Sequence, residues 1–316
     1  MYQVIINEVN IGNGGIIMAN DISSTIKWAD VSLNVITGCL NHVDGYCKGG
    51  GFPCYAYKLA HGRLKERYLA NKNTATDRYD EDSYPFYPRF WPERLTTKGI
   101  PKGSLIFLND MSDWMGSWIP DEWKRAILDF IEANPDHTFL TLTKQPQELV
   151  KWNPFPENCW VGVTATNSKA GFVSAYFLRD IQARVKFCSV EPMLGDFLDL
   201  SRKMPWFLMK YINWLIIGSC TGTRSEMLGF QQKYPDLTVM PFGRKWTCQP
   251  KVEWVQEIVE AADKAGVKVF LKDNLNPLFA NDDCKLFTEH KNTLFTFKDY
   301  EGESIARWHL RQEFPC

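Results

Sequence analysis

The chain has 316 residues, 45% of them hydrophobic, so it can bury the core of one large α/β domain or of two ordinary ones. Its 36 Lys and Arg residues balance 37 Asp and Glu residues. The overall charge therefore favours neither nucleic acid, nor a membrane surface, nor an acidic substrate, and the composition excludes a largely disordered chain.

Residues 1–24 are predicted to be an N-terminal extension. They lack the basic region followed by a sustained apolar run that defines a secretory signal. No uncharged apolar stretch approaches the roughly 18 residues of a membrane span. We therefore expect a cytoplasmic protein with no membrane partner, whose nine cysteines are thiols rather than disulfides.

Three cysteines, Cys39, Cys47 and Cys54, lie in a loop that is rich in Gly and Asn and has no apolar periodicity. Glycines let a backbone wrap so that several sulfurs converge on a metal or cluster. Two interpretations remain open on chemistry alone: a four-iron cluster with one iron free to bind a substrate or cofactor, and a structural zinc with His42 as fourth ligand. A solvent-facing loop without metal is a third.

Residues from about 60 to 103 are predicted to be an insertion, charged at first and then aromatic and proline-rich. The segment from Tyr84 to Trp91, interleaved with Arg89 and followed by Arg94, has the composition of a surface that stacks nucleic-acid bases. The alternative is a proline-fixed lid that packs on its own domain.

From residue 104 onward, continuous apolar runs predict strands buried on both faces, at 104–109, 138–143, 159–164, 185–190, 213–218 and 267–272. Helices are predicted between them, most clearly over 121–134 and 251–265. This alternation predicts an α/β fold with parallel strands in an open sheet or a barrel. Cys159, Cys188 and Cys220 lie in or beside these runs and are predicted to be core residues.

Polar or small residues follow each run at once, among them Asn109, Lys144, Glu191, Gly218 and Lys272. Because the carboxyl ends of parallel strands share one edge, where active sites form, these residues are site candidates. Polar strand ends also arise simply where strands reach solvent. Lys144 and Glu191 adjoin apolar runs, where a charge needs a partner, and an alternative role for them is a mutual ion pair.

Several sequence blocks match a known family in order. Trp28-Ala29-Asp30 leads into residues 34–39, then Cys47 and Cys54-Tyr55-Ala56, and later blocks lie at 106–113, 140–146, 160–164, 189–195 and 214–218. In this order they resemble the phage Gp37/Gp68-like family (DUF5131), whose members resemble radical S-adenosylmethionine enzymes. The resemblance covers about residues 25–275.

The resemblance implies a partial or complete (β/α) barrel of parallel strands over 25–275, with an N-terminal cluster-binding loop and the insertion at about 60–103. Residues 276–316 would form a small C-terminal extension of short strands and turns. Enzymes of this class bind S-adenosylmethionine at a [4Fe-4S] cluster and cleave it reductively to a 5'-deoxyadenosyl radical, while the protein positions the reactants.

The resemblance also implies residue roles. The cluster would be held by Cys39, Cys47 and Cys54, and S-adenosylmethionine would contact Asn109, Ser112, Asp113, Lys144, Thr164, Glu191 and Gly218. Asn109, Ser112 and Asp113 suit turns and helix caps equally well. An external electron donor is implied as a partner. Nucleic acid or a nucleotide is one substrate class suggested by analogy, and the need for a partner protein stays open.

The chain departs from the usual radical-enzyme pattern of Cys-x3-Cys-x2-Cys, since its spacing is Cys-x7-Cys-x6-Cys. The glycines at 49–51 make this spacing sterically tolerable. The glycine-rich stretch after the late strand contains Cys220, which faces either the core or the site. Two further hypotheses are a zinc-stabilised binding protein without chemistry and a family member that folds but binds no cluster.

Overall fold

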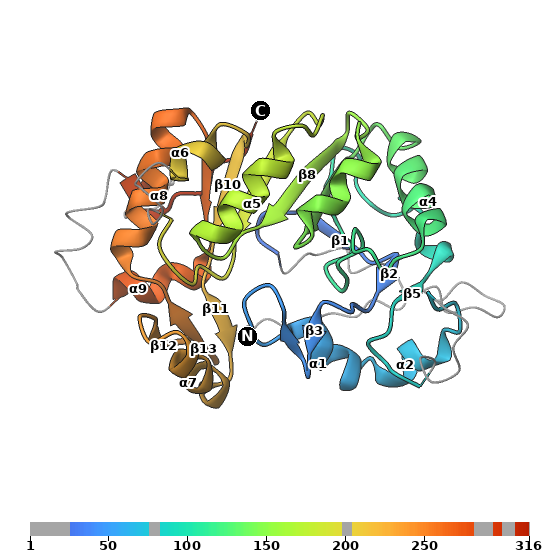
Figure 1. Ribbon diagram of the computed structural model, residues 1–316, viewed down its shortest axis with the longest axis horizontal. Helices are drawn as coiled ribbons and strands as arrows, with labels where there is room; N and C mark the ends of the chain where they lie inside the picture. The colour runs from blue at the N-terminus through green and yellow to red at the C-terminus, as the bar shows by residue number, and fades with distance from the viewer. Residues whose placement is uncertain (1–25, 76–82, 198–203, 281–292, 299–306, 316) are drawn as a thin grey trace. The chain divides into compact units, whose positions relative to one another are not determined.

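A computed structural model describes residues 26–75, 83–197, 204–280, 293–298 and 307–315 (Figure 1). The predicted extension at residues 1–24 and two of the cysteines, Cys284 and Cys316, lie outside this part of the chain.

Seven parallel strands form the central sheet, in the order β1-β6-β7-β8-β9-β10-β14. They are β1 (Val31–Leu33), β6 (Leu105–Leu108), β7 (Thr138–Thr143), β8 (Cys159–Thr164), β9 (Lys186–Val190), β10 (Trp214–Ile217) and β14 (Lys268–Leu271). All six predicted runs are strands, and their continuous apolar character is explained by burial, complete for every residue of β8 and β10. The predicted α/β class, a partial (β/α) barrel of parallel strands, is confirmed.

The helices that follow these strands begin and end where the sequence signals lie. They are α4 (Asp121–Glu132), η2 (Pro146–Trp152), α5 (Ser168–Leu178), α6 (Met204–Met209), α8 (Val252–Ala265), η3 (Asp273–Leu275) and α9 (Asn276–Ala280). Two acidic residues lie in the first turn of α4, and α8 ends at Gly266, whose φ of 72° is left-handed. In Figure 1, α6 lies between α5 and α8, and it contacts both.

The chain divides into two compact units. The first comprises residues 1–40, 55–142 and 155–160, and the second comprises residues 41–54, 143–154 and 161–316. Most of the segment between Cys39 and Cys54 therefore belongs to the second unit, although the chain on both sides of it belongs to the first.

The aromatic segment of the predicted insertion is buried within the first unit. This part of the unit contains β2 (Ile36–Thr37), α1 (Tyr55–His61), α2 (Lys65–Ala70), β5 (Arg89–Phe90), which pairs with β2, and η1 (Pro92–Arg94). Phe86, Tyr87 and Trp91 are each less than 9% exposed. Arg89 is fully buried and donates to the carbonyls of Tyr84 and Tyr87. This burial favours the interpretation of residues 84–91 as a segment that packs on its own domain over that of a surface that stacks nucleic-acid bases.

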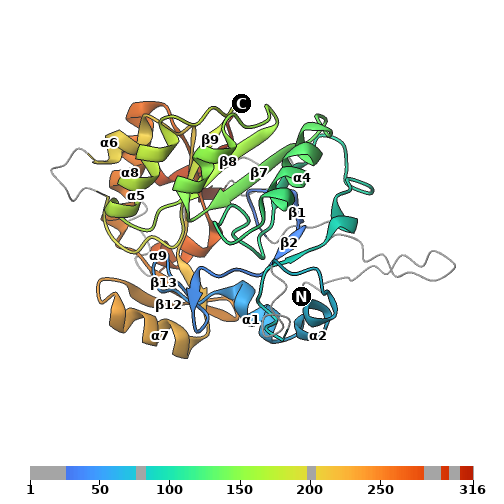
Figure 2. The ribbon, with the colours of Figure 1, turned by 45° about the vertical axis from the view of Figure 1, so that its right-hand side comes forward.

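The second unit carries a small antiparallel sheet in the order β11-β13-β12, formed by β11 (Cys220–Gly222), β12 (Thr238–Phe242) and β13 (Lys245–Gln249). Helix α7 (Arg224–Lys233) packs on this sheet, as Figure 2 shows. Their shared core includes Cys220, Met227, Phe230 and Cys248. A short hairpin of β3 (His42–Val43) and β4 (Tyr46–Cys47) belongs to the same unit.

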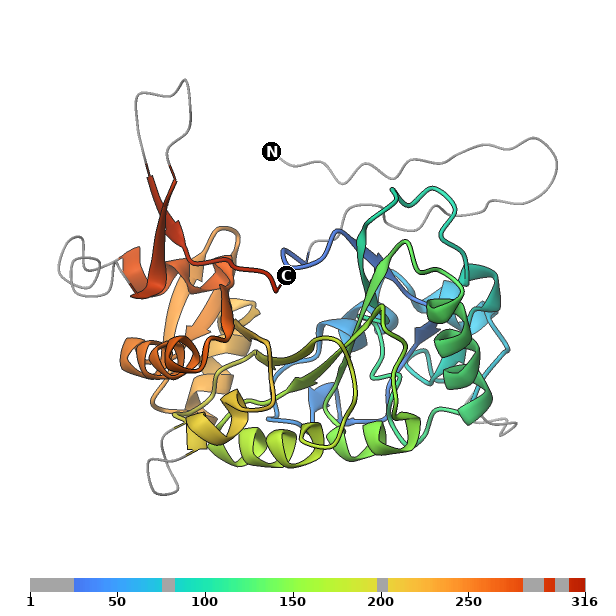
Figure 3. The ribbon, with the colours of Figure 1, turned by 90° about the horizontal axis from the view of Figure 1, so that it is seen from above.

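The C-terminal residues pair with the last strand of the central sheet. A hairpin of β15 (Phe295–Lys298) and β16 (Arg307–Leu310), red in Figure 3, leads into them. Leu271 donates its backbone N–H to the Arg311 carbonyl, and Glu313 donates its own to the Val269 carbonyl. The indole Nε1 of Trp214 donates to the Glu313 carbonyl at 2.7 Å. These residues thus cover β14, the edge strand of the sheet.

None of the helices in the described ranges combines the length and the apolar content that crossing a lipid bilayer requires.

Gly162 in β8 gives a direct test of this packing. A Cβ added to it would overlap the ring of Phe187 in β9, which is fully buried. We expect Gly162→Ala to lower the free energy of unfolding by about 1–3 kcal/mol through overpacking, measured by denaturant unfolding. Gly229→Ala in α7 is the control: it meets nothing within 4 Å, and it should raise stability by up to about 1 kcal/mol. Equal stability of Gly162→Ala and the wild-type chain would contradict this packing.

Candidate functional site

None of the three loop cysteines forms a disulfide in the part of the chain that the structure describes. Cys39 follows β2 and Cys54 precedes α1, and both are partly exposed, whereas Cys47 in β4 is buried. Among the residues that the structure describes, no group of three or more His, Cys, Asp or Glu side chains is arranged to hold a metal ion.

The backbone folds back on itself between Cys47 and Cys54. The Cys47 N–H donates to the Phe52 carbonyl at 2.9 Å, and the Cys54 N–H donates to the Gly45 carbonyl at 2.8 Å. Gly45 and Gly51 adopt φ angles of 81° and 67°, a region that glycine enters without steric cost. This turn brings Phe52 back beside Cys47, so the six residues between Cys47 and Cys54 form a compact loop.

Side chains that follow β7, β8 and α7 hold this cysteine loop, which we define as residues 41–54. The Thr166 hydroxyl donates to the Gly49 carbonyl at 3.3 Å, and the Tyr234 hydroxyl donates to the Gly50 carbonyl at 2.6 Å. Lys144 lies against Gly49, where an added Cβ would approach its Cδ to 3.2 Å. The cysteine loop therefore lies beside two residues of the second unit, Lys144, which follows β7, and Thr166, which follows β8.

In the first unit, the residues after β6 support the segment that leads into Cys39. Asn109 has a positive φ of 59°, and its Oδ1 accepts from the Ile36 N–H at 2.7 Å. The Ser112 hydroxyl donates to the Gly38 carbonyl at 2.6 Å. These contacts match the predicted turn role of Asn109 and Ser112.

Asp113 is 7% exposed, and its carbonyl accepts the Gly116 N–H at 3.0 Å in the same turn.

Two of the predicted residues contain buried polar atoms without a hydrogen-bond partner among the described residues. They are Nδ2 of Asn109, which is 1% exposed, and Oγ1 of Thr164, the last residue of β8, which is 8% exposed. Buried polar groups almost always have a partner, so these two atoms are candidates for contacts to a bound molecule.

Glu191, after β9, forms an ion pair with Lys272, after β14. The two residues flank Gly218 at the end of β10: a Cβ on Gly218 would approach Lys272 Cδ to 3.0 Å and Glu191 Cδ to 3.2 Å. The ion pair therefore fits beside residue 218 because a glycine there has no side chain. The sequence pointed to Lys144 as a partner for Glu191, whereas the pairing with Lys272 required the strand order.

A network of amides fixes the backbone beside this ion pair, and the sequence gave no signal for it. Asn274 accepts from the Ser219 N–H at 3.2 Å and donates to the Ser219 carbonyl at 2.8 Å. Gln249, which is fully buried, donates to the Asn274 carbonyl and to the Thr247 hydroxyl, each at 2.7 Å. The network joins the end of β10 to η3 and to β13.

The remaining described cysteines are core residues, as predicted for three of them. Cys159, Cys188 and Cys220 are at most 5% exposed, and Cys220 faces the core it shares with Cys248. Burial raises the pKa of Cys159 and Cys188 to about 12 and that of Cys248 to about 11. Because the thiolate is the reactive form, these cysteines carry less thiolate near neutral pH than an exposed cysteine does.

The predicted family is confirmed by the match of residues 23–231 to the family described as "Protein of unknown function (DUF5131)". The chain belongs to that family. No curated protein matches it significantly.

The chain is also similar to solved structures of spore photoproduct lyase. A double mutant with bound AdoMet and dinucleoside spore photoproduct is 12% identical with a TM-score of 0.46, and 78% of each chain is covered. A complex with dinucleoside spore photoproduct is 12% identical with a TM-score of 0.44, and a single mutant is 14% identical with a TM-score of 0.45; both cover 79% of each chain. The activity of this chain has to be inferred from its own site.

The exposure of the thiols predicts their order of modification. In chelator-treated protein at pH 8, we expect a maleimide to label Cys39 and Cys54 first, because both are partly exposed. Cys159 and Cys188 should be labelled only after unfolding, since burial raises their pKa to about 12. Peptide mass spectrometry over a time course measures the order. Early labelling of Cys188 would contradict the burial of β9.

The Glu191–Lys272 ion pair predicts a loss of stability when one partner is removed. Lys272→Met leaves the Glu191 carboxylate unpaired, with only 25% of its side chain exposed. Because both side chains are still partly hydrated, we expect a loss of about 1–2 kcal/mol in the free energy of unfolding. Glu191→Gln combined with Lys272→Met should recover part of it. The control is Lys264→Met on the exposed side of α8, which should have no effect.

Proposed function

We propose that this protein is a radical S-adenosylmethionine enzyme whose [4Fe-4S] cluster is held by Cys39, Cys47 and Cys54. When bound, such a cluster supplies the electron that cleaves S-adenosylmethionine to a 5'-deoxyadenosyl radical. The single observation that carries the proposal is the contact of the cysteine loop with Lys144 and Thr166, the residues that follow β7 and β8. In parallel α/β folds, the edge of the sheet where the strands end is where active sites form.

The donor set fits such a cluster chemically. Three thiols without a fourth leave one iron open for a ligand, and the glycines of the loop supply the necessary backbone freedom. No three-ligand group is preformed among the described side chains. Because metal binding is coupled to the ordering of its ligands, we expect the thiols to turn toward the cluster as it is assembled.

In this proposal the residues at the strand ends bind and orient S-adenosylmethionine. The buried Nδ2 of Asn109 can donate a hydrogen bond, and Oγ1 of Thr164 can donate or accept one. Glu191, held in place by Lys272, offers carboxylate oxygens beside Gly218, whose bare backbone permits close approach. Ser112, Asp113 and Lys144 remain candidates for contacts to the same cofactor.

The proposal also requires an external electron donor. Its substrate is to be identified by which compound loses hydrogen to the cofactor, and a nucleotide or nucleic acid is the first class to test. Location in the cytoplasm remains part of the proposal.

One observation favours the alternative of a structural zinc site. His42 and Cys47 are direct cross-strand partners in the β3–β4 hairpin, so their side chains lie on the same face. Histidine and cysteine are both zinc ligands. The protein would then be a zinc-stabilised binding protein without chemistry.

Metal content and cofactor cleavage decide between the two. After anaerobic purification and reconstitution, we expect about four irons per chain with visible absorption, and dithionite-dependent formation of 5'-deoxyadenosine from S-adenosylmethionine. Cys54→Ala should lose both the iron and this product, to below about one-hundredth of the wild-type rate. A colourless protein with one zinc would exclude the proposal.

The matched control is Cys284→Ala, which removes a thiol outside both the cysteine loop and the segment matched by the family. It should keep full iron content and cleavage activity. His42→Ala separates the alternatives further, because it should remove a zinc ion but leave the iron in place. Wild-type cleavage by Cys54→Ala would overturn the ligand assignment.

A further inference from the structure

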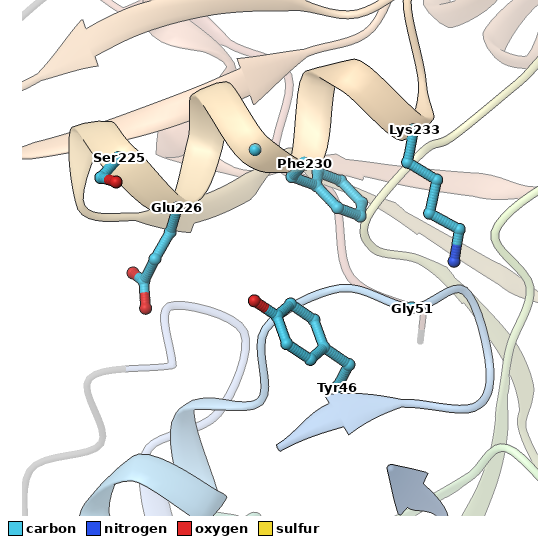
Figure 4. A pocket seen from close by; sticks show the side chains of 7 residues that line it. Tyr46, Gly51, Ser225, Glu226, Phe230 and Lys233 are labelled. Carbon is cyan, nitrogen blue, oxygen red and sulfur yellow. The ribbon is translucent and has the colours of Figure 1, made fainter. Parts of the chain in front are cut away.

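A cavity of about 440 Å³ opens between the cysteine loop and α7 (Figure 4). Tyr46 and Gly51 line it from the loop, and Ser225, Glu226, Gly229, Phe230 and Lys233 line it from the helix. Its volume lies within the usual range of small-molecule sites, about 300–1,000 Å³. None of these residues has a role in the proposed cluster or cofactor site.

The helix contributes one continuous face to this cavity. Its five lining residues follow the spacing of one, three, one and three, which places them along one side of an α-helix. Figure 4 shows Glu226, Phe230 and Lys233 pointing from this face toward the loop. An acid therefore lies near one end and a cation near the other, about 10 Å apart along the helix axis.

Gly229 is unexplained by the fold. It lies inside α7 without a positive φ, and a Cβ added to it would meet nothing within 4 Å. A glycine inside a helix is unfavourable relative to alanine. Its bare backbone leaves a flat, open wall in the cavity, next to the buried ring of Phe230. Space for a ligand accounts for a glycine that neither backbone geometry nor packing requires.

Three side chains supply recognition. The ring of Tyr46 is 51% exposed and points into the cavity, a position suited to stacking on a flat ring. The Lys233 ammonium reaches Gly51 and lies 5.5 Å from the centroid of the Tyr234 ring, and no acidic group in the described part of the chain forms an ion pair with it. Its charge is therefore available to an anion. Glu226 already caps α7 by accepting from the Thr223 N–H, so its carboxylate is fixed in position.

We propose that this cavity binds a nucleoside monophosphate. The base would lie against Tyr46 and the flat wall at Gly229, and the phosphate would pair with Lys233. The fixed carboxylate of Glu226 would accept hydrogen bonds from the base or the ribose. The inference goes beyond the proposed function, because binding at this site requires no electron transfer.

Calorimetric titration of the anaerobically purified protein tests it with the four ribonucleoside monophosphates, uridine and ribose 5-phosphate. At least one monophosphate should bind more tightly than both fragments. Lys233→Gln should weaken monophosphate binding about tenfold and change uridine binding less than twofold, because only the charge pair is lost. Tyr46→Ala should weaken both. Raising the salt concentration should reduce only the Lys233-dependent part.

Filling the cavity gives an independent test. Gly229→Leu should abolish binding, and Gly229→Ala should fold with an unchanged or raised melting temperature but weaken monophosphate binding, because its Cβ enters the wall of the cavity. Lys245→Gln, an exposed lysine on β13, is the matched control for charge and should bind like the wild-type protein. The proposal is overturned if no monophosphate binds, or if Lys233→Gln binds as the wild type does. If Gly229→Leu does not fold, the Lys233→Gln result decides.

The two proposals can fail separately. A protein that binds a monophosphate but forms no 5'-deoxyadenosine keeps this cavity as a nucleotide site and excludes the radical chemistry. A protein that cleaves S-adenosylmethionine but binds no monophosphate supports the radical chemistry and excludes the nucleotide site.

Discussion

The candidate site depends on how a loop without a core of its own is held in place. Residues 41–54 are held by the backbone carbonyls of Gly49 and Gly50, which accept hydrogen bonds from Thr166 and Tyr234, and by Phe52, which packs on the core shared by α7 and the small sheet. Buried carbonyls need such partners, and each neutral hydrogen bond contributes about 1 kcal/mol net. The two hydroxyls hold Gly49 and Gly50, which lie between Cys47 and the wall of the cavity at Gly51.

Much of the fold could be predicted from the sequence because the strands are buried on both faces. Continuous apolar runs such as 159–164 and 213–218 have few alternatives to a central parallel strand, and both are strands. Helix α8 was equally clear, since its apolar residues recur at helical spacing and Gly266 ends it. The sequence could not decide whether the aromatic segment at residues 84–91 is buried or exposed, because buried and base-stacking segments contain the same types of aromatic residue.

The site was predicted less completely, for a physical reason. A sequence shows that Glu191 follows a buried strand and needs a partner, but the choice between Lys144 and Lys272 depends on which strand ends are neighbours. The order β9-β10-β14 supplies that information and also explains Gly218, whose missing side chain leaves room for the ion pair. Asn274 and Gln249 gave no signal, because amides are as common in exposed turns as in buried networks.

The C-terminal segment affects the tendency of the protein to aggregate. An uncovered edge strand presents unpaired N–H and carbonyl groups that recruit other chains. Residues 311–313 occupy those groups on β14, and the Trp214 indole is tied to them through Glu313. The segment that the sequence predicted to be a small C-terminal extension thus protects the sheet from self-association: a chain without residues 311–313 would expose the apolar edge strand β14 and become prone to aggregate.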